Sequence, residues 1–153
     1  MNKKEIVLVL HNVRSRFNVG AIFRTADGAG VAKIFLCGIT PRPPHDKIAK
    51  VSLGAEKYIP WEYYLQTVRL LKNLKKLGYQ VVALEQSRKS LHYNKCGSVK
   101  PVALVVGNEI SGLPATILNL ANQVIEIPMH GQKESLNVAV ATGIVLFNMI
   151  NTR

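Results

Sequence analysis

The sequence predicts a single α/β domain built around a mostly parallel sheet with flanking helices. Short apolar runs alternate with segments of helical periodicity, and the runs are continuously apolar instead of alternating with polar residues. Such runs are typical of strands covered on both faces, as in parallel sheets. Of the 153 residues 48% are hydrophobic, so one domain with a sizeable core is expected over residues 1–153.

The first part of the chain predicts a strand, a helix and a second strand. Residues 5–10 and 32–37 are short runs in which apolar side chains dominate, and both are expected to be buried strands. Residues 19–29 between them predict a helix, with Asn18 near its N-cap and Gly30 at its end.

The rest of the chain continues this alternation. The Pro-rich residues 40–45 predict a loop, and residues 62–76 predict an amphipathic helix, because apolar side chains recur along one face. Pro114 suits the first turn of a short helix that ends near Leu120, and Ser135 is expected to open and cap a final helix. The remaining predicted strands are residues 81–84, 102–106 and 124–127.

Cysteine usage and hydropathy argue against metal sites and membrane spans. Cys37 and Cys96 lie far apart without metal-ligand spacing, so each is expected to be a small buried residue in a reducing, cytoplasmic setting. The N-terminal apolar run is too short for the core of a signal peptide. Residues 136–150 form the longest apolar region, but polar side chains interrupt it and it falls short of a membrane span.

The net charge of +11 is unevenly distributed. Residues 1–100 contain 18 Lys and Arg against 6 Asp and Glu, whereas residues 101–153 are slightly acidic. A basic surface over the first two-thirds of the chain indicates a polyanionic partner, most simply nucleic acid. Ordinary solubilising charge is the alternative, and the bias alone does not separate RNA, DNA and anionic lipid.

Three polar stretches follow predicted strands, where open α/β sheets bind ligands. The first, residues 11–24, contains three arginines and two asparagines around a strand-to-helix turn. A guanidinium offers donors in a fixed fork that suits a phosphate group, although a capped surface helix with solvated arginines would have the same sequence. Gly20 in this stretch would allow a close backbone approach.

The other two stretches place single polar residues at the same edge. In residues 107–114, Gly107 would let a flat ligand approach the backbone, and Glu109 is either a site carboxylate or a loop carboxylate near the next helix. In residues 127–138, Asn137 is polar within an otherwise apolar helix, which indicates either a structural hydrogen bond or a role in the site.

Taken in order, these stretches resemble the three signature motifs of the SpoU (TrmH-like) branch of the SPOUT methyltransferases. Motif 1 corresponds to residues 18–26 (NVGAIFRTA) and motif 2 to residues 107–113 (GNEISGL). Motif 3 corresponds to residues 127–129 (IPM) together with residues 135–139 (SLNVA), and residues 50–56 (KVSLGAE) resemble a further family segment. The resemblance covers effectively the whole chain.

The resemblance implies a deep C-terminal trefoil knot, S-adenosylmethionine as the cofactor, no metal, and a homodimer whose active sites take residues from both subunits. By position, the cofactor pocket would be lined by Leu84, Gly107, Ile127, Met129, Ser135 and Leu136. The catalytic neighbourhood would consist of Arg24, Asn18, Glu109, Ser135 and Asn137. Larger relatives carry an added RNA-binding domain or terminal extensions, and neither is expected here.

The implied function is methylation of a ribose 2′-hydroxyl in RNA, with tRNA favoured over rRNA. Arg24 would clamp a neighbouring phosphate and stabilise the developing oxyanion, because arginine stays protonated. Glu109 or a phosphate oxygen would accept the proton. The alternative is a non-catalytic RNA-binding dimer that retains the fold. A nucleotide-binding oxidoreductase does not fit, because the sequence has no phosphate loop.

The basic region supplies the candidate RNA contacts. Those in loops or near strand ends are Arg14, Arg16, Arg42, Lys47, Lys50, Arg88 and Lys89. The predicted helix face that bears Lys72 and Lys76 is a weaker candidate, because amphipathic helices expose such charges in any case.

Overall fold

The computed structural model describes residues 4–152, which fold around one seven-stranded sheet in which all neighbouring strands are parallel. The strand order is β3-β2-β1-β6-β4-β7-β5. The strands are β1 (Ile6–His11), β2 (Lys33–Cys37), β3 (Trp61–Tyr64), β4 (Gln80–Leu84), β5 (Leu91–His92), β6 (Val102–Val106) and β7 (Gln123–Glu126). The helices are α1 (Arg16–Ala29), α2 (Asp46–Ser52), α3 (Thr67–Lys76), α4 (Ala115–Leu120) and α5 (Val138–Asn151), with 3-10 turns η1 (Ala55–Lys57) and η2 (Tyr93–Lys95). The predicted fold class is therefore confirmed.

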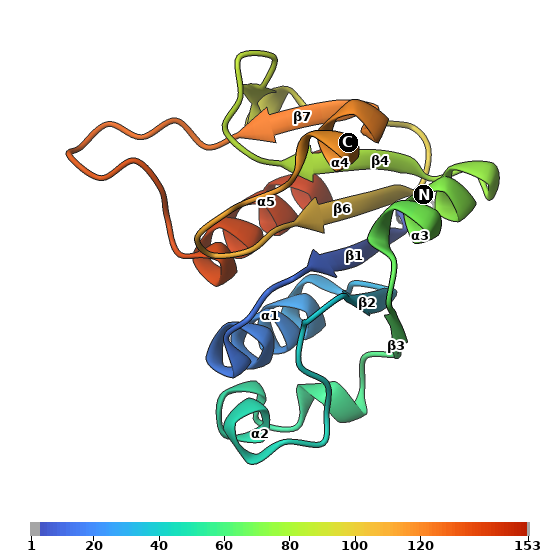
Figure 1. The fold of residues 1–153 in the computed structure, drawn as a ribbon, viewed down its shortest axis with the longest axis vertical. Helices are drawn as coiled ribbons and strands as arrows, with labels where there is room; N and C mark the ends of the chain where they lie inside the picture. The colour runs from blue at the N-terminus through green and yellow to red at the C-terminus, as the bar shows by residue number, and fades with distance from the viewer. Residues whose placement is uncertain (1–3, 153) are drawn as a thin grey trace.

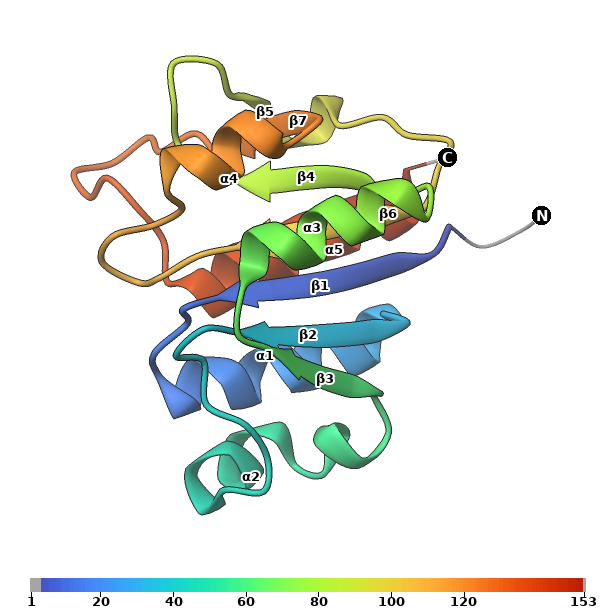
Figure 2. The same ribbon diagram turned by 45° about the vertical axis from the view of Figure 1, so that its right-hand side comes forward.

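Helices cover both faces of the sheet. α1 and α5 lie on one face, with α2 packed beside α1, and α3 and α4 lie on the other (Figures 1 and 2). Along β1, Leu8 and Leu10 belong to the core under α1 and α5, whereas Val7 and Val9 belong to the core under α3. Burial on both faces is the reason why the strands are apolar at every position.

The helix predicted over residues 62–76 is partly wrong. Its first residues belong to β3, which pairs with β2 at the edge of the sheet, and α3 begins only at Thr67. Burial alternates along β3, and its aromatic side chains suit a half-buried strand. The pairing with β2 is a tertiary contact, so the local spacing of apolar residues did not reveal it.

Two helices begin at other residues than predicted, and in each case an asparagine has another position in the helix than expected. The Ser15 hydroxyl caps α1 by accepting the Asn18 N–H at 3.2 Å, so Asn18 is buried in the first turn and is not the cap. Asn137 caps α5, so Ser135 precedes the helix instead of opening it, and Asn137 is not inside it. The short elements α2 and β5 lie where the sequence predicted no element.

Gly20 has the close neighbour that the sequence led us to expect. A Cβ atom at Gly20 would lie 2.6 Å from the carbonyl oxygen of Ile48, because α1 packs directly on α2. This contact fixes α2 beside the start of α1, where α2 presents Lys47 and Lys50.

The segment between β7 and α5 extends beyond the carboxyl end of β7 before it returns to α5, which packs against α1 (Figure 1). The threading of this part of the chain into a knot stays a prediction. None of the helices within residues 4–152 is long and apolar enough to cross a membrane.

Candidate active site

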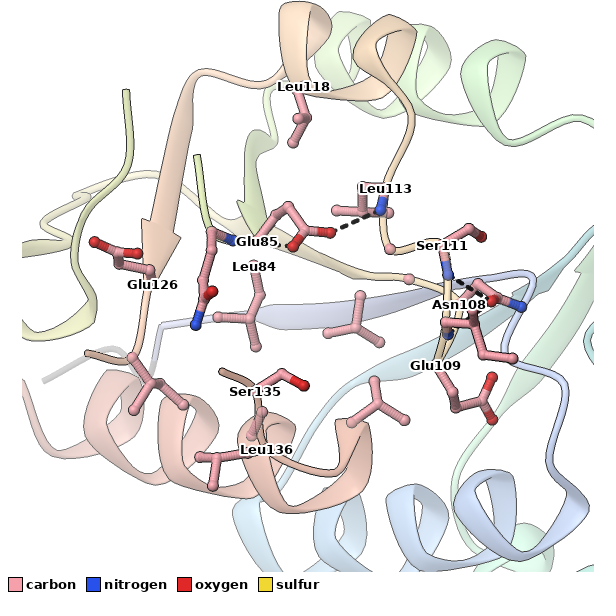
Figure 3. A pocket seen from close by; sticks show the side chains of 18 of the residues that line it. Leu84, Glu85, Asn108, Glu109, Ser111, Leu113, Leu118, Glu126, Ser135 and Leu136 are labelled. Carbon is pink, nitrogen blue, oxygen red and sulfur yellow. Dashed lines mark hydrogen bonds between the residues drawn. The ribbon is translucent and has the colours of Figure 1, made fainter. Parts of the chain in front are cut away.

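The carboxyl ends of β4, β6 and β7 converge on a cavity of about 440 Å³, and the loops that follow these strands form its walls (Figure 3). This is the edge at which α/β sheets bind ligands. All six residues expected to bind the cofactor lie in its lining: Leu84, Gly107, Ile127, Met129, Ser135 and Leu136. Their contact with a cofactor stays a prediction. Within residues 4–152, no cluster of three or more His, Cys, Asp or Glu side chains could hold a metal ion.

Gly107 has a structural role in addition to the expected one in ligand approach, which stays a prediction. A Cβ atom at this position would lie 2.7 Å from the carbonyl carbon and oxygen of Gly112, because the loop after β6 folds back on itself. The Oδ1 atom of Asn108 holds this turn by accepting the N–H groups of Ile110 and Ser111 at 2.9 and 3.0 Å (Figure 3). The glycine is therefore required by the loop, whether or not a ligand approaches.

Two consecutive residues after β4 tie the walls of the cavity together. The Oε2 atom of Glu85 accepts the Leu113 N–H at 2.8 Å, which anchors the loop after β6 (Figure 3). The Nε2 atom of Gln86 donates to the backbone oxygen of Glu134 at 2.6 Å, which anchors the segment after β7. Their position directly after a predicted strand marked both residues as polar side chains of interest, but neither was among the predicted site residues.

The side chain of Glu109 is fixed by three hydrogen bonds. Its Oε1 atom accepts the Arg14 N–H at 2.8 Å, and its Oε2 atom accepts the Ser15 N–H at 2.8 Å and the Asn18 Nδ2 atom at 2.9 Å. Glu109 therefore contacts the start of α1 and not the helix that follows it in sequence. Partial burial acts to raise the pKa of Glu109, but the hydrogen bonds outweigh it and lower the pKa below its ordinary value of 4.5.

Asn18, which is bonded to Glu109, also forms a hydrogen bond to the residue that caps α5. Its Oδ1 atom accepts a hydrogen bond from the Nδ2 atom of Asn137 at 3.0 Å, while the Oδ1 atom of Asn137 accepts the N–H groups of Ala139 and Val140. Glu109, Asn18 and Asn137 thus form one hydrogen-bonded chain that joins the loop after β6, α1 and α5. For Asn137 the structural hydrogen bond and the place in the site, which the sequence left as alternatives, are both present.

Arg24 takes no part in these hydrogen bonds and lies on another face of α1. It follows Asn18 by six residues on α1 and therefore points about 240° around the helix axis from it. Its side chain is exposed, on the same stripe of α1 as the exposed Phe17. Ser135 is not part of these hydrogen bonds, but it lines the same cavity as Glu109. Three of the five expected catalytic residues are thus joined by hydrogen bonds, Ser135 shares the cavity with one of them, and Arg24 lies away from the other four.

The basic residues expected to contact RNA divide into separate groups. Four of them line a second cavity of about 790 Å³ next to the first: Arg14, Arg16, Lys47 and Lys50. The guanidinium of Arg42 lies instead over the ring of Tyr63, at 4.1 Å from its centroid. Arg88 and Lys89 are exposed in the loop after β4, toward the opposite edge of the sheet from α2 (Figure 1).

Comparison with known proteins decides the family. The profile of the SpoU rRNA Methylase family matches residues 5–147. The chain belongs to the SpoU family. The motifs by which the sequence resembled this family lie at the start of α1, in the loop after β6 and between β7 and α5, so the fold brings all three to the carboxyl edge of the sheet.

The SpoU-family chain is similar to proteins named as RNA methyltransferases. It is 36% identical to a tRNA (guanosine(18)-2′-O)-methyltransferase of Aquifex aeolicus, over 95% of this chain and 68% of that protein. It is 32% identical to the 23S rRNA (guanosine-2′-O-)-methyltransferase RlmB of Vibrio parahaemolyticus, over 97% of this chain and 60% of that protein. The AdoMet-bound rRNA methyltransferase from Sinorhizobium meliloti superposes with a TM-score of 0.90 and 36% identity, over 96% of this chain and 56% of the other.

Proposed function

We propose that this protein transfers a methyl group from S-adenosylmethionine to a ribose 2′-hydroxyl in RNA. The observation that carries the proposal is the cavity at the carboxyl edge, which is walled by the segments of motifs 2 and 3 and linked to motif 1 by the hydrogen bonds from Glu109 through Asn18 to Asn137. The names of the relatives support the same activity. We propose tRNA before rRNA as the substrate class, in the cytoplasm, where these RNAs function.

The cavity suits the proposed cofactor. Its volume of about 440 Å³ lies within the usual range for small-molecule sites, and its lining combines apolar side chains such as Leu84, Ile127 and Leu136 with polar groups. These apolar side chains would pack against the adenine ring, and the hydrogen bonds of Glu85 and Gln86 would keep the walls at the right separation. When bound, S-adenosylmethionine supplies a methyl group attached to a positively charged sulfur.

The protein's contribution to the transfer is orientation and charge stabilisation. The ribose 2′-oxygen forms a bond to the methyl carbon as the bond from carbon to sulfur breaks, and the hydroxyl proton must leave. Both oxygens of Glu109 already accept hydrogen bonds, and its lowered pKa makes it a weak base. We therefore assign Glu109 the positioning of Asn18, and a phosphate oxygen of the RNA as the proton acceptor.

A second copy of the chain would supply Arg24. The exposed stripe of α1 that bears Arg24 continues onto α5, since a Cβ atom at Gly28 would lie 3.7 Å from the ring of Phe147. Val140, Ile144 and Phe147 form an exposed apolar surface on α5. We propose that two copies pack through these helices, which would bring Arg24 to the partner's cavity, where it would clamp a phosphate and stabilise the oxyanion.

The test is methyl transfer from radiolabelled S-adenosylmethionine to total tRNA and rRNA, followed by mapping of ribose methylation. We expect alkali-resistant linkages in the RNA and unchanged cofactor binding in the presence of a chelator. Cofactor binding without transfer to any RNA would favour the non-catalytic RNA-binding dimer. If calorimetry shows no binding of S-adenosylmethionine, or if the chelator abolishes its binding, the proposal is contradicted.

A further inference from the structure

Asn12, which follows β1 directly, has a backbone conformation that few side chains adopt. Its φ angle of 53° lies in the left-handed region, which asparagine tolerates better than most other residues. Its N–H donates to the Cys37 carbonyl at 3.2 Å, and its carbonyl accepts the Nδ2 atom of Asn108 at 2.8 Å. Asn12 therefore connects the end of β2 with the loop after β6.

The amide of Asn12 has one orientation that satisfies its neighbours. Its Oδ1 atom accepts the Ile39 N–H at 3.0 Å and occupies space that Gly38 leaves open, since a Cβ atom at Gly38 would lie 1.9 Å from it. The Nδ2 atom must therefore face His11, whose Nε2 atom lies 3.3 Å away. An amide nitrogen donates and does not accept, so the Nε2 atom of His11 accepts and carries no proton.

The second ring nitrogen of His11 completes this assignment. With Nε2 unprotonated, the neutral imidazole carries its proton on Nδ1, which donates to the Oγ1 atom of Thr67 at 2.6 Å. Thr67 is buried at the start of α3, so the ring is held from both sides. A proton on Nε2 would face the N–H groups of the Asn12 amide, and the hydrogen bond between these two side chains would be lost.

The groups around His11 favour this neutral form. Burial lowers the pKa of His11 below its ordinary value of 6.5. Arg69 and Lys72 on α3 line the same cavity of about 510 Å³ as His11, and both cations act against a charged ring. Cys37, opposite His11 on β2, stays uncharged because burial raises the pKa of its thiol to about 11. The lining residues from the start of α4 carry no charge, and the carboxylate of Glu109 is directed toward the start of α1.

Asn108 connects Asn12 to the wall of the cofactor cavity. Its Nδ2 atom donates to the Asn12 carbonyl, and its Oδ1 atom accepts the N–H groups of Ile110 and Ser111 (Figure 3). These residues belong to the turn of residues 108–112, which lines the cavity proposed for S-adenosylmethionine. The position of this turn relative to β1 therefore depends on the backbone of Asn12.

We propose that His11 is a positioning residue for methyl transfer, because its neutral ring fixes Asn12 and Asn12 fixes the turn of residues 108–112 beside the cofactor. Protonation converts the accepting nitrogen into a donor, which repels the amide of Asn12 and loosens the turn. The cavity should therefore bind S-adenosylmethionine tightly only while His11 is neutral. The inference rests on the proposed function, and it adds two residues that lie outside the motif segments.

The first experiment measures the affinity for S-adenosylmethionine by calorimetry from about pH 7.5 down to about pH 5. In the wild type the affinity should hold above pH 6.5 and fall about fivefold as the pH drops through the lowered pKa, because one hydrogen bond is lost. His11→Gln places an amide oxygen near the position of Nε2 and does not titrate, so it should keep the neutral-pH affinity throughout. His11→Leu removes the acceptor and should bind weakly at every pH. His130→Gln, at an exposed histidine that does not line the cavity, is the matched control and should keep the wild-type pH dependence.

The second experiment is NMR of the cofactor-free protein, so its outcome does not depend on cofactor binding. Imidazole spectra should show the neutral His11 ring with its proton on Nδ1, and the signal is identified by its absence in His11→Gln. The amide signals of Ile110 and Ser111 should shift as His11 titrates in the wild type. The same signals should stay constant over this pH range in His11→Gln.

Three outcomes would overturn the inference: a proton on Nε2 of the neutral His11 ring, turn amides that do not respond to the titration of His11, or an unchanged pH dependence of cofactor affinity in His11→Gln. None of the three measurements requires His11→Leu to fold. Turn amides that follow His11 in a wild type that does not bind S-adenosylmethionine would contradict the proposed function alone. Cofactor binding with turn amides that do not follow His11 would contradict the positioning role alone.

Discussion

The Nδ2 atom of Asn137 donates to the Oδ1 atom of Asn18 across 3.0 Å, and this bond joins the first turn of α1 to the cap of α5. Because Glu109 holds the amide nitrogen of the same Asn18, the orientation of that side chain is fixed from both ends. Displacement of either helix or of the loop after β6 would disturb all three residues.

Asn137→Ala removes both the cap of α5 and the bond to Asn18, so we expect a loss of about 1 kcal/mol in stability together with loss of methyl transfer. Asn137→Ser separates the two effects. Its shorter side chain can still cap the helix but cannot reach Asn18, so thermal unfolding should stay close to that of the wild type while activity falls. A serine variant with full activity would show that only the cap matters.

Glu109 should contribute to the pH dependence of folding. Its pKa is lowered in the folded protein, so its stabilisation is fully present above the ordinary value of 4.5 and is lost as the pH falls through the folded value. Glu109→Gln should therefore be less stable than the wild type at neutral pH, and the difference should shrink below about pH 4.5. Urea unfolding at a series of pH values measures this, with Asp27→Asn on the exposed face of α1 as the control. A difference that is constant with pH would contradict the assignment.

Gln86→Ala should loosen the segment after β7 where it borders the cofactor cavity. Only one hydrogen bond, to the Glu134 carbonyl, is lost at an exposed position, so we expect little change in thermal stability. The affinity for S-adenosylmethionine, measured by calorimetry, should fall about tenfold, which corresponds to the loss of one hydrogen bond. Gln132→Ala, at an exposed glutamine in the same segment, is the matched control. Equal effects in the two variants would remove the specific role of Gln86.

Arg24→Ala should abolish methyl transfer and leave the affinity for S-adenosylmethionine nearly unchanged, because Arg24 does not line the cofactor cavity of its own protomer. Arg24→Lys should also be poor, since an ammonium group does not reproduce the guanidinium fork. Full activity in the lysine variant would mean that only the charge is needed.

Mixing two variants tests whether, in the proposed dimer, Arg24 acts on the partner's site. Leu136→Arg should block the cofactor cavity, and neither this variant nor Arg24→Ala should be active alone. If Arg24 serves the partner, a dimer with one subunit of each kind contains one complete site, and mixing should restore activity. If Arg24 serves its own protomer, the mixture should stay inactive.

Neutralising Arg14 and Arg16 should flatten the salt dependence of RNA binding. The expected change in the log–log slope is about 0.7 per phosphate contact on a single strand. Neutralising Lys72 and Lys76 on α3, which do not line the second cavity, should barely alter the slope. A reduced slope in the α3 pair with an unchanged slope in the Arg14 and Arg16 pair would place the RNA on the other face of the sheet.

The sequence by itself determined the α/β class, the positions of the long strands and the concentration of polar residues at their carboxyl ends. These features follow from burial and chain direction, which leave a local pattern in the order of apolar and polar residues. Resemblance to the SpoU motifs added six of the residues that line the first cavity. Edge strand β3 escaped prediction because its pattern, although it suits a strand, spans only four residues, and the pairing with β2 is not visible in the sequence.

Only the tertiary structure decided which of the polar residues meet. Glu109 reaches Asn18 across 91 positions of the chain, and Asn18 reaches Asn137 across 119. Such contacts depend on the strand order, which places β6 beside β1, and on the packing of α5 against α1. Arg24 is near Asn18 in sequence and yet points away from it, because a helix turns neighbouring residues to different faces.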